Sequence, residues 1–147
     1  MIGVVLTGHG SFAPGLADSL RLIAGEQERF AAVAFTPELS PEDLSARLLN
    51  AVEQVGKEGV LILCDLAGGT PFNETVKLLS TLTCPAEVLA GVNLPALIEA
   101  CTDRDDQTPA SLAQQVQDTG REGLAQLLLG EDSEEDFDES RALPTEP

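Results

Sequence analysis

The fold is decided by one apolar stretch, GVLILCDL at residues 59–66. Its centre is apolar without alternation, which is typical of a parallel strand that is buried on both faces. Shorter apolar runs at residues 2–6, 30–35 and 87–91 predict three further strands. Segments in which apolar residues recur at helical spacing separate the four runs. The sequence therefore predicts an α/β fold, with an open, doubly wound and mainly parallel sheet and helices on both faces.

Proline follows a hydroxyl side chain at three predicted helix starts, Ser40-Pro41, Thr70-Pro71 and Thr108-Pro109. The hydroxyl caps the helix, and proline suits the first helical position. Gly25 is the expected end of the first helix. The charged run at residues 103–106 is interpreted as a solvated helix end.

The chain has the size of one domain, with 147 residues, and its charge is strongly acidic. Eight Lys and Arg residues against 25 Asp and Glu residues give a net charge of −17, and the sequence has no Trp or Tyr. Such a chain repels phosphate backbones and has little to stack on bases, which excludes nucleic acid as a partner. The apolar runs are far shorter than the roughly 20 residues of a membrane span, and the N-terminus lacks signal-peptide features. We therefore expect a cytoplasmic protein.

The acid excess is concentrated at residues 131–147, which hold eight acids and one base, Arg141. Such a segment cannot bury enough apolar surface to fold. The sequence predicts one domain over residues 1–130 and a disordered acidic tail over residues 131–147. The tail is interpreted either as a solubilising end or as a docking or linker segment.

The cysteines and the single histidine limit the possible metal chemistry. Cys64, Cys84 and Cys101 are odd in number and form no C-x-x-C pair, so neither a disulfide framework nor a zinc cluster is indicated. A single histidine, His9, excludes multi-histidine metal sites. Cys64 is interpreted as a core residue, with a redox effect on the neighbouring Asp65 as the alternative.

Polar side chains follow three of the predicted strands. His9 follows the first strand, Asp65 ends the most apolar one, and Asn93 follows the last. The carboxyl ends of parallel strands share one edge of the sheet, where ligands of such sheets bind. The glycines of Thr7-Gly8-His9-Gly10 are interpreted as allowing a tight turn and a close approach by another backbone, with the imidazole exposed.

His9 is a candidate nucleophile for phosphoryl transfer. A histidine carries a phosphoryl group when one ring nitrogen is free to attack and the other is held protonated. Asp65 is the candidate partner of the second nitrogen. The alternatives are that His9 is a turn residue without a chemical role and that Asp65 only caps a turn.

Gly68-Gly69-Thr70 is a candidate anion site. Only here does a capped helix follow a buried strand through a glycine pair, which places backbone N–H groups and the positive end of a helix dipole at the same edge. A phosphoryl group fits such a position. The segment is not a nucleotide P-loop, because the lysine of that pattern is absent.

In combination these residues resemble the mannose-type IIA components of the bacterial phosphoenolpyruvate-dependent sugar phosphotransferase system (PTS), the mannose/fructose/sorbose superfamily. The resemblance spans roughly Met1 to Leu129. It rests on five ordered blocks: TGHG at 7–10, GEQ at 25–27, DLAGGTPFN at 65–73, GVNLP at 91–95 and TGREG at 119–123. Thr70 stands where many relatives have serine. The combination of the first and third blocks looks closest to the N-acetylgalactosamine/galactosamine branch.

The resemblance implies that His9 accepts a phosphoryl group from phospho-HPr and passes it to a IIB component, which phosphorylates sugar as the membrane components IIC and IID import it. Asp65 would orient His9, and transfer would use the ring nitrogen that the aspartate does not hold. Thr70, with the backbone at Gly68, Gly69 and Gly10, would contact the phosphoryl oxygens. No metal or organic cofactor is expected.

The resemblance also implies a homodimer, in which a C-terminal antiparallel strand pairs with the partner's sheet. Residues 124–129 are the candidate for this exchanged edge strand, against their own helical propensity, because Gly120 and Gly123 interrupt the preceding helix. Many relatives continue through a linker into a IIB domain, whereas this chain ends, and we expect a separate IIA subunit.

Three predicted site segments, residues 7–15, 66–73 and 88–98, contain no Asp, Glu, Lys or Arg, so Asp65 is the charged residue expected at the site. We expect an apolar docking rim for the partners there, formed by Phe12, Phe72, Asn93 and Leu94. The alternatives are that the phenylalanines pack against the sheet and that Asn93 serves its own turn. Two other functions stay open: a regulatory phosphoprotein that is not coupled to transport, and a His-Asp enzyme that acts on a phosphorylated metabolite.

Overall fold

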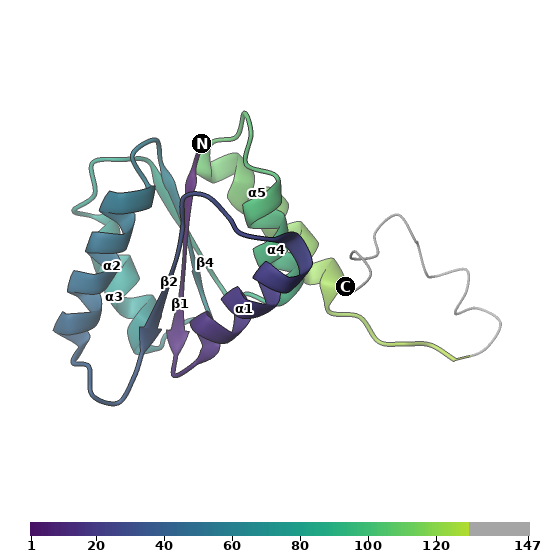
Figure 1. The fold of residues 1–147 in the computed structure, drawn as a ribbon, viewed down its shortest axis with the longest axis horizontal. Helices are drawn as coiled ribbons and strands as arrows, with labels where there is room; N and C mark the ends of the chain where they lie inside the picture. The colour runs from purple at the N-terminus through teal and green to yellow at the C-terminus, as the bar shows by residue number, and fades with distance from the viewer. Residues whose placement is uncertain (130–147) are drawn as a thin grey trace.

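Within residues 1–129, which are those that the computed structural model describes, four parallel strands form one sheet in the order β2-β1-β3-β4 (Figure 1). The predicted acidic tail, 131–147, lies outside the described residues. The strands are β1 (Gly3–His9), β2 (Phe30–Phe35), β3 (Val60–Cys64) and β4 (Ala86–Ala90). The parallel α/β sheet that the apolar runs predict is confirmed.

Helices cover both faces of the sheet, as predicted (Figure 1). One face carries α1 (Phe12–Ala24), α4 (Leu94–Thr102) and α5 (Pro109–Gly123), and the other carries α2 (Pro41–Val55) and α3 (Thr70–Leu79). Strand β3 is buried along its whole length because its side chains alternate between the two cores. In the part of the chain that is described, no helix is long and apolar enough to cross a membrane.

The predicted helix starts are correct, but Thr70 is not a cap. Ser40 and Thr108 form capping boxes at α2 and α5. At α3 the N-cap is Gly69, and Thr70 is the first helical residue, without a side-chain capping bond. The structure gives the Thr70 hydroxyl no partner within residues 1–129, which distinguishes it from the other two hydroxyls.

The turn predicted at residues 7–10 begins later in the chain than expected. Strand β1 continues through Gly8 to His9, and the chain turns only at Gly10, where φ is +58°. Gly8 serves close approach instead of turning. A Cβ at this position would lie 2.5 Å from Phe12 Cδ1 and 2.9 Å from Asp65 Cγ.

Residues 124–129 form neither helix nor strand in the single chain. The expectation that both glycines interrupt the helix is wrong for Gly120, through which α5 continues, whereas α5 does end at Gly123. These glycines allow α5 to pack closely on the start of α4. A Cβ at Gly123 would lie 2.6 Å from Pro95 Cγ, and one at Gly120 would lie 3.2 Å from Ala96 Cβ.

Arg104 joins three chain segments at the amino ends of the strands, although it lies in the run that was interpreted as solvated. Its guanidinium donates to the main-chain oxygens of Ile2 at 3.0 Å, Arg29 at 3.1 Å, Glu28 at 2.7 Å and Cys101 at 3.1 Å. The residue is only 3% exposed. The bonds to Ile2, Glu28 and Arg29 tie the loop after α4 to the starts of β1 and β2, and the bond to Cys101 ties Arg104 to α4 itself.

We predict that Arg104→Met lowers the free energy of unfolding by about 3 kcal/mol, because it leaves several carbonyl groups buried without donors. Chemical denaturation measures the loss. Arg47→Met, at an exposed position of α2, is the control and should change stability by less than about 0.5 kcal/mol. Equal effects of the two substitutions would contradict the structural role of Arg104.

Candidate functional site

The candidate site lies at the carboxyl edge of the sheet, where β1 and β3 end side by side. The chain leaves β1 toward β2 on one side, and β3 lies on the other side, so the strand order reverses between β1 and β3. Ligands of open α/β sheets bind at such a switch point. His9 is the last residue of β1, and Asp65 directly follows β3.

Asp65 holds both the ring and the main chain of His9. Its Oδ2 lies 2.7 Å from His9 Nδ1 and accepts the His9 backbone N–H at 2.9 Å. Its Oδ1 accepts the backbone N–H of Leu66 at 2.9 Å. A carboxylate only accepts, so Nδ1 carries the proton and the lone pair of the neutral ring is on Nε2. The His9 side chain is 47% exposed and that of Asp65 is 11% exposed.

Hydrogen bonding keeps Asp65 ionised. Burial alone would raise the pKa of this carboxyl, but the donors on His9 and Leu66 together lower the pKa below its ordinary value. The carboxylate is therefore present throughout the neutral range. It can stabilise a positive charge that develops on the imidazole.

The start of α3 lies directly against the free side of the His9 ring. A Cβ on Gly69 would lie 2.6 Å from His9 Cε1 and 3.2 Å from Nε2, so only a glycine leaves this space open. Gly68 has φ +86°, and its carbonyl oxygen accepts from Asn73 Nδ2 at 3.2 Å, which fixes the loop. The N-terminus of α3, which is the positive end of its helix dipole, thus lies beside Nε2.

Phe35 also contacts the site, although nothing in the sequence singles it out. Its ring centroid lies 6.1 Å from that of His9 at an interplanar angle of 68°. Its carbonyl oxygen accepts the backbone N–H of Gly10 at 2.7 Å. The apolar run at 30–35 marked Phe35 only as part of a strand.

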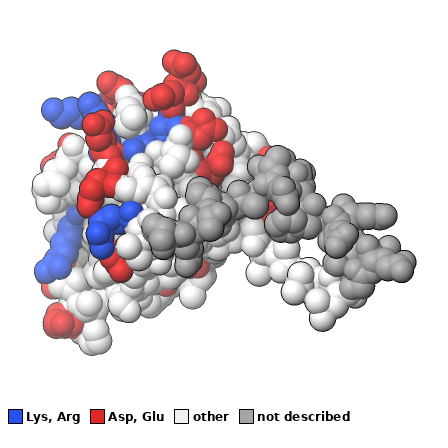
Figure 2. Space-filling view, turned by 45° about the vertical axis from the view of Figure 1, so that its right-hand side comes forward, with Lys and Arg blue, Asp and Glu red and all other residues white. Residues whose placement is uncertain are grey.

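Three residues of the expected docking rim are half-buried. Phe12 and Leu94 pack against the core under α1, α4 and α5, and Phe72 packs against the opposite core. Leu66 is 48% exposed beside Asp65 and was not predicted. In Figure 2 the charged side chains gather on the upper and left parts of the visible face, and the lower edge, toward which the strands run in Figure 1, carries few.

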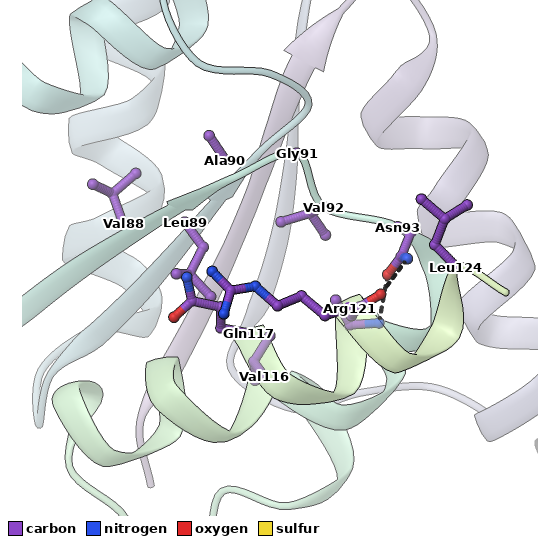
Figure 3. A pocket seen from close by; sticks show the side chains of 12 residues that line it. Val88, Leu89, Ala90, Gly91, Val92, Asn93, Val116, Gln117, Arg121 and Leu124 are labelled. Atoms are coloured by element: carbon purple, nitrogen blue, oxygen red, sulfur yellow. Dashed lines mark hydrogen bonds between the residues drawn. The ribbon is translucent and has the colours of Figure 1, made fainter. Parts of the chain in front are cut away.

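Asn93 makes its hydrogen bonds within the chain and none to His9 or Asp65. Its Oδ1 accepts the backbone N–H of Ala96 at 3.1 Å, and its Nδ2 donates to the Gly120 carbonyl oxygen at 2.9 Å (Figure 3). The amide therefore caps α4 and ties α5 to it. This geometry favours the turn role that the sequence left open for Asn93.

Cys64 lies behind Asp65 as a core residue. Burial raises the pKa of its thiol to about 11, and the thiol contacts Thr75 Oγ1 at 3.9 Å. A protonated, buried thiol is a poor redox centre. Among residues 1–129, no group of three or more His, Cys, Asp or Glu side chains is placed to hold a metal ion.

A family model described as the PTS system fructose IIA component, EIIA-man, matches residues 3–117. The chain belongs to this family. It is 27% identical over 137 residues to the sorbose-specific EIIA component of Lacticaseibacillus casei, covering 91% of this chain and 99% of that protein. It is 34% identical over 128 residues to the mannose-specific EIIAB component of Escherichia coli (strain K12), covering 86% of this chain but only 39% of that protein.

Solved structures agree with this assignment. The chain is similar to the phosphotransferase system component EIIA from Streptococcus agalactiae, with a TM-score of 0.81 and 34% identity over 86% of this chain and 97% of that chain. It is therefore a IIA component of a sugar phosphotransferase system, in a family whose general role is histidine phosphoryl transfer to IIB. The N-acetylgalactosamine branch stays a prediction.

We expect His9→Ala to raise the Asp65 pKa, because it removes the ring donor and leaves the burial. A carboxyl whose folded pKa lies below the unfolded value of about 3.9 stabilises the fold above that value. This stabilisation is lost as the pH falls through the folded pKa. In His9→Ala the folded pKa lies nearer the unfolded value, so the stabilisation is smaller and its loss is complete at a higher pH.

Carbon NMR of the side-chain carboxyls over a pH titration measures this shift. Asp43, whose pKa is lowered by hydrogen bonds with Ser40 at the start of α2, is an internal control and should titrate alike in both proteins. An Asp65 titration that is unchanged by the substitution would contradict the assigned hydrogen bond.

Proposed function

We propose that His9 accepts a phosphoryl group on Nε2 from phospho-HPr and passes it to a IIB component, so that the chain is the phosphocarrier of a sugar-importing PTS. The observation that carries this proposal is the 2.7 Å contact of Nδ1 with Asp65, which leaves Nε2 free against the start of α3. The membrane components IIC and IID would take part only through IIB. We further propose a cytoplasmic location, where these partners act.

The transfer step uses the lone pair of Nε2. This lone pair forms the new N–P bond while the P–N bond of the donor breaks, and its electron pair stays on the donor imidazole. The His9 ring becomes positively charged, and the Asp65 carboxylate compensates this charge through the Nδ1–H bond. The Thr70 hydroxyl and the backbone at Gly68, Gly69 and Gly10 would bind the phosphoryl oxygens.

The partners would dock on the edge that carries His9. We propose a rim of Phe12, Phe72, Asn93 and Leu94, and we add Leu66 to it because this side chain is exposed beside Asp65. Residues 7–15, 66–73 and 88–98 hold no charged side chain, so these segments do not repel a phosphorylated partner. Apolar anchors suit a transient interface of this kind.

The direct test is incubation with phosphoenolpyruvate, enzyme I and HPr, followed by measurement of acid-labile phosphate on the native protein and on His9→Ala. We expect label on the native protein and none on the variant. Label that persists on a folded His9→Ala would refute the assigned acceptor. Addition of a IIB component then separates transport from regulation, because only a transport subunit loses its label to IIB.

The position of Nε2 is tested by Gly69→Ala, whose methyl group would occupy the space beside that atom. We expect phosphorylation to slow by at least about tenfold, since misplaced reacting groups lose up to about a hundredfold in rate. Gly15→Ala in α1 is the matched control, because a Cβ there meets nothing within 4 Å. Equal rates in the two variants would argue against attack from Nε2.

A homodimer would use the free edge of β4. A groove of about 580 Å³ lies between this strand and α5 and is lined by residues 88–93 and by side chains of α5 that include Val116, Gln117 and Arg121 (Figure 3). Next to it, residues 124–129 carry four leucines that are 85%, 79%, 47% and 89% exposed. We propose that this segment of one protomer pairs with β4 of its partner.

We predict that the double substitution Leu127→Asp and Leu128→Asp weakens the dimer by at least about tenfold, because it places charges in an apolar contact. Sedimentation equilibrium measures the dissociation constant. Leu22→Asp is the control, since Leu22 is 58% exposed on α1 and outside the proposed interface. A native protein that stays monomeric at high concentration would contradict the exchange.

A further inference from the structure

We infer that Phe35 is a positioning residue for phosphoryl transfer, which fixes the plane of the His9 ring so that Nε2 faces the start of α3. Phe35 is the last residue of β2 and lies opposite His9 in the register of β1 and β2. The ring centroids are 6.1 Å apart at an angle of 68°, which is an edge-to-face arrangement. This inference rests on the proposed role of His9.

His9 needs a second restraint besides Asp65. The carboxylate holds the ring at one atom, Nδ1, and the side chain is 47% exposed. A single hydrogen bond at the rim of a half-exposed ring leaves the ring free to swing about that bond. Gly69, which lacks a side chain, approaches Cε1 and Nε2 without filling the space beside them. A contact from another direction is therefore required to fix the ring plane.

Phe35 supplies this contact from the opposite strand. Strand β2 and strand β3 lie on either side of β1, so Phe35 and Asp65 approach His9 from opposite sides. Phe35 is partly buried and packs against the core under α2 and α3, which holds its ring in place. The imidazole is thus held between a packed aromatic ring and a hydrogen-bonded carboxylate.

The main chain of Phe35 contributes separately from its ring. Its carbonyl oxygen accepts the N–H of Gly10, which stabilises the turn that directly follows His9. A side-chain substitution keeps this hydrogen bond and removes only the ring contact. The two roles of Phe35 can therefore be distinguished experimentally.

The test compares Phe35→Leu with Phe30→Leu. Phe30 begins the strand that Phe35 ends, is also partly buried, and packs against the opposite core. Single-turnover transfer from phospho-HPr is followed at increasing donor concentrations. We expect the maximal rate of Phe35→Leu to fall about tenfold with an unchanged half-saturating concentration, since misalignment alone lowers rates by up to about a hundredfold. Phe30→Leu should keep the native rate.

Two further variants and a spectroscopic readout make the result decisive. Phe35→Tyr keeps the aromatic ring and should restore most of the rate, whereas Phe35→Met, which is flexible and not aromatic, should show the same loss as Phe35→Leu. In proton NMR the His9 Cε1–H resonance of Phe35→Leu should lose its ring-current shift. All rates are compared below the melting temperatures of the variants.

Two results would overturn the inference. One is a maximal rate of Phe35→Leu within about twofold of that of Phe30→Leu, and the other is a change confined to the half-saturating concentration, which would make Phe35 a docking residue. Failure of the proposed function is a different outcome, because the native protein itself would then carry no label on His9.

Discussion

The hydrogen bond between Asp65 and His9 is the contact on which the site depends. It forms because β1 and β3 are parallel neighbours with Thr7 opposite Cys64, so that Asp65, which follows β3, reaches the same edge as His9, the last residue of β1. The carboxylate then crosses the position of Gly8, where a side chain would block it. The order of the strands, their register and the missing Cβ of Gly8 together make Nδ1 a donor and leave the lone pair of the neutral ring on Nε2.

At two glycines of the site the missing side chain matters, and the conformational freedom of the backbone does not. Gly8 lies within β1, and Gly69 caps α3 with φ −84°, a conformation open to any residue. What both positions require is the absence of a Cβ next to Asp65 or to the His9 ring. Gly10 and Gly68 differ, because both adopt positive φ and a Cβ on either would meet no other atom within 4 Å. Glycine-rich motifs thus combine two distinct physical constraints.

Apolar runs and helix caps were sufficient to predict the sheet, the helix starts and the edge at which His9 and Asp65 meet. The extension of β1 to His9 was not predictable, because a glycine that makes room for Asp65 looks the same in sequence as a glycine that turns. Phe35 and Arg104 were missed for a related reason. Phe35 resembles any strand residue, and Arg104 stands among acids, yet tertiary packing brings one to the imidazole and buries the other among carbonyl groups. Residues 124–129 form neither helix nor strand in the single chain, and the exchanged strand stays a prediction.

The central claim is that Asp65 keeps Nδ1 protonated and leaves Nε2 as the attacking atom. The most direct measurement is nitrogen and phosphorus NMR of the phosphorylated protein with labelled histidine, which shows through the N–P coupling which ring nitrogen carries the phosphoryl group. The structure predicts phosphorus on Nε2, with Nδ1 still protonated. A phosphoryl group on Nδ1 would contradict the account, because that atom would first have to leave Asp65.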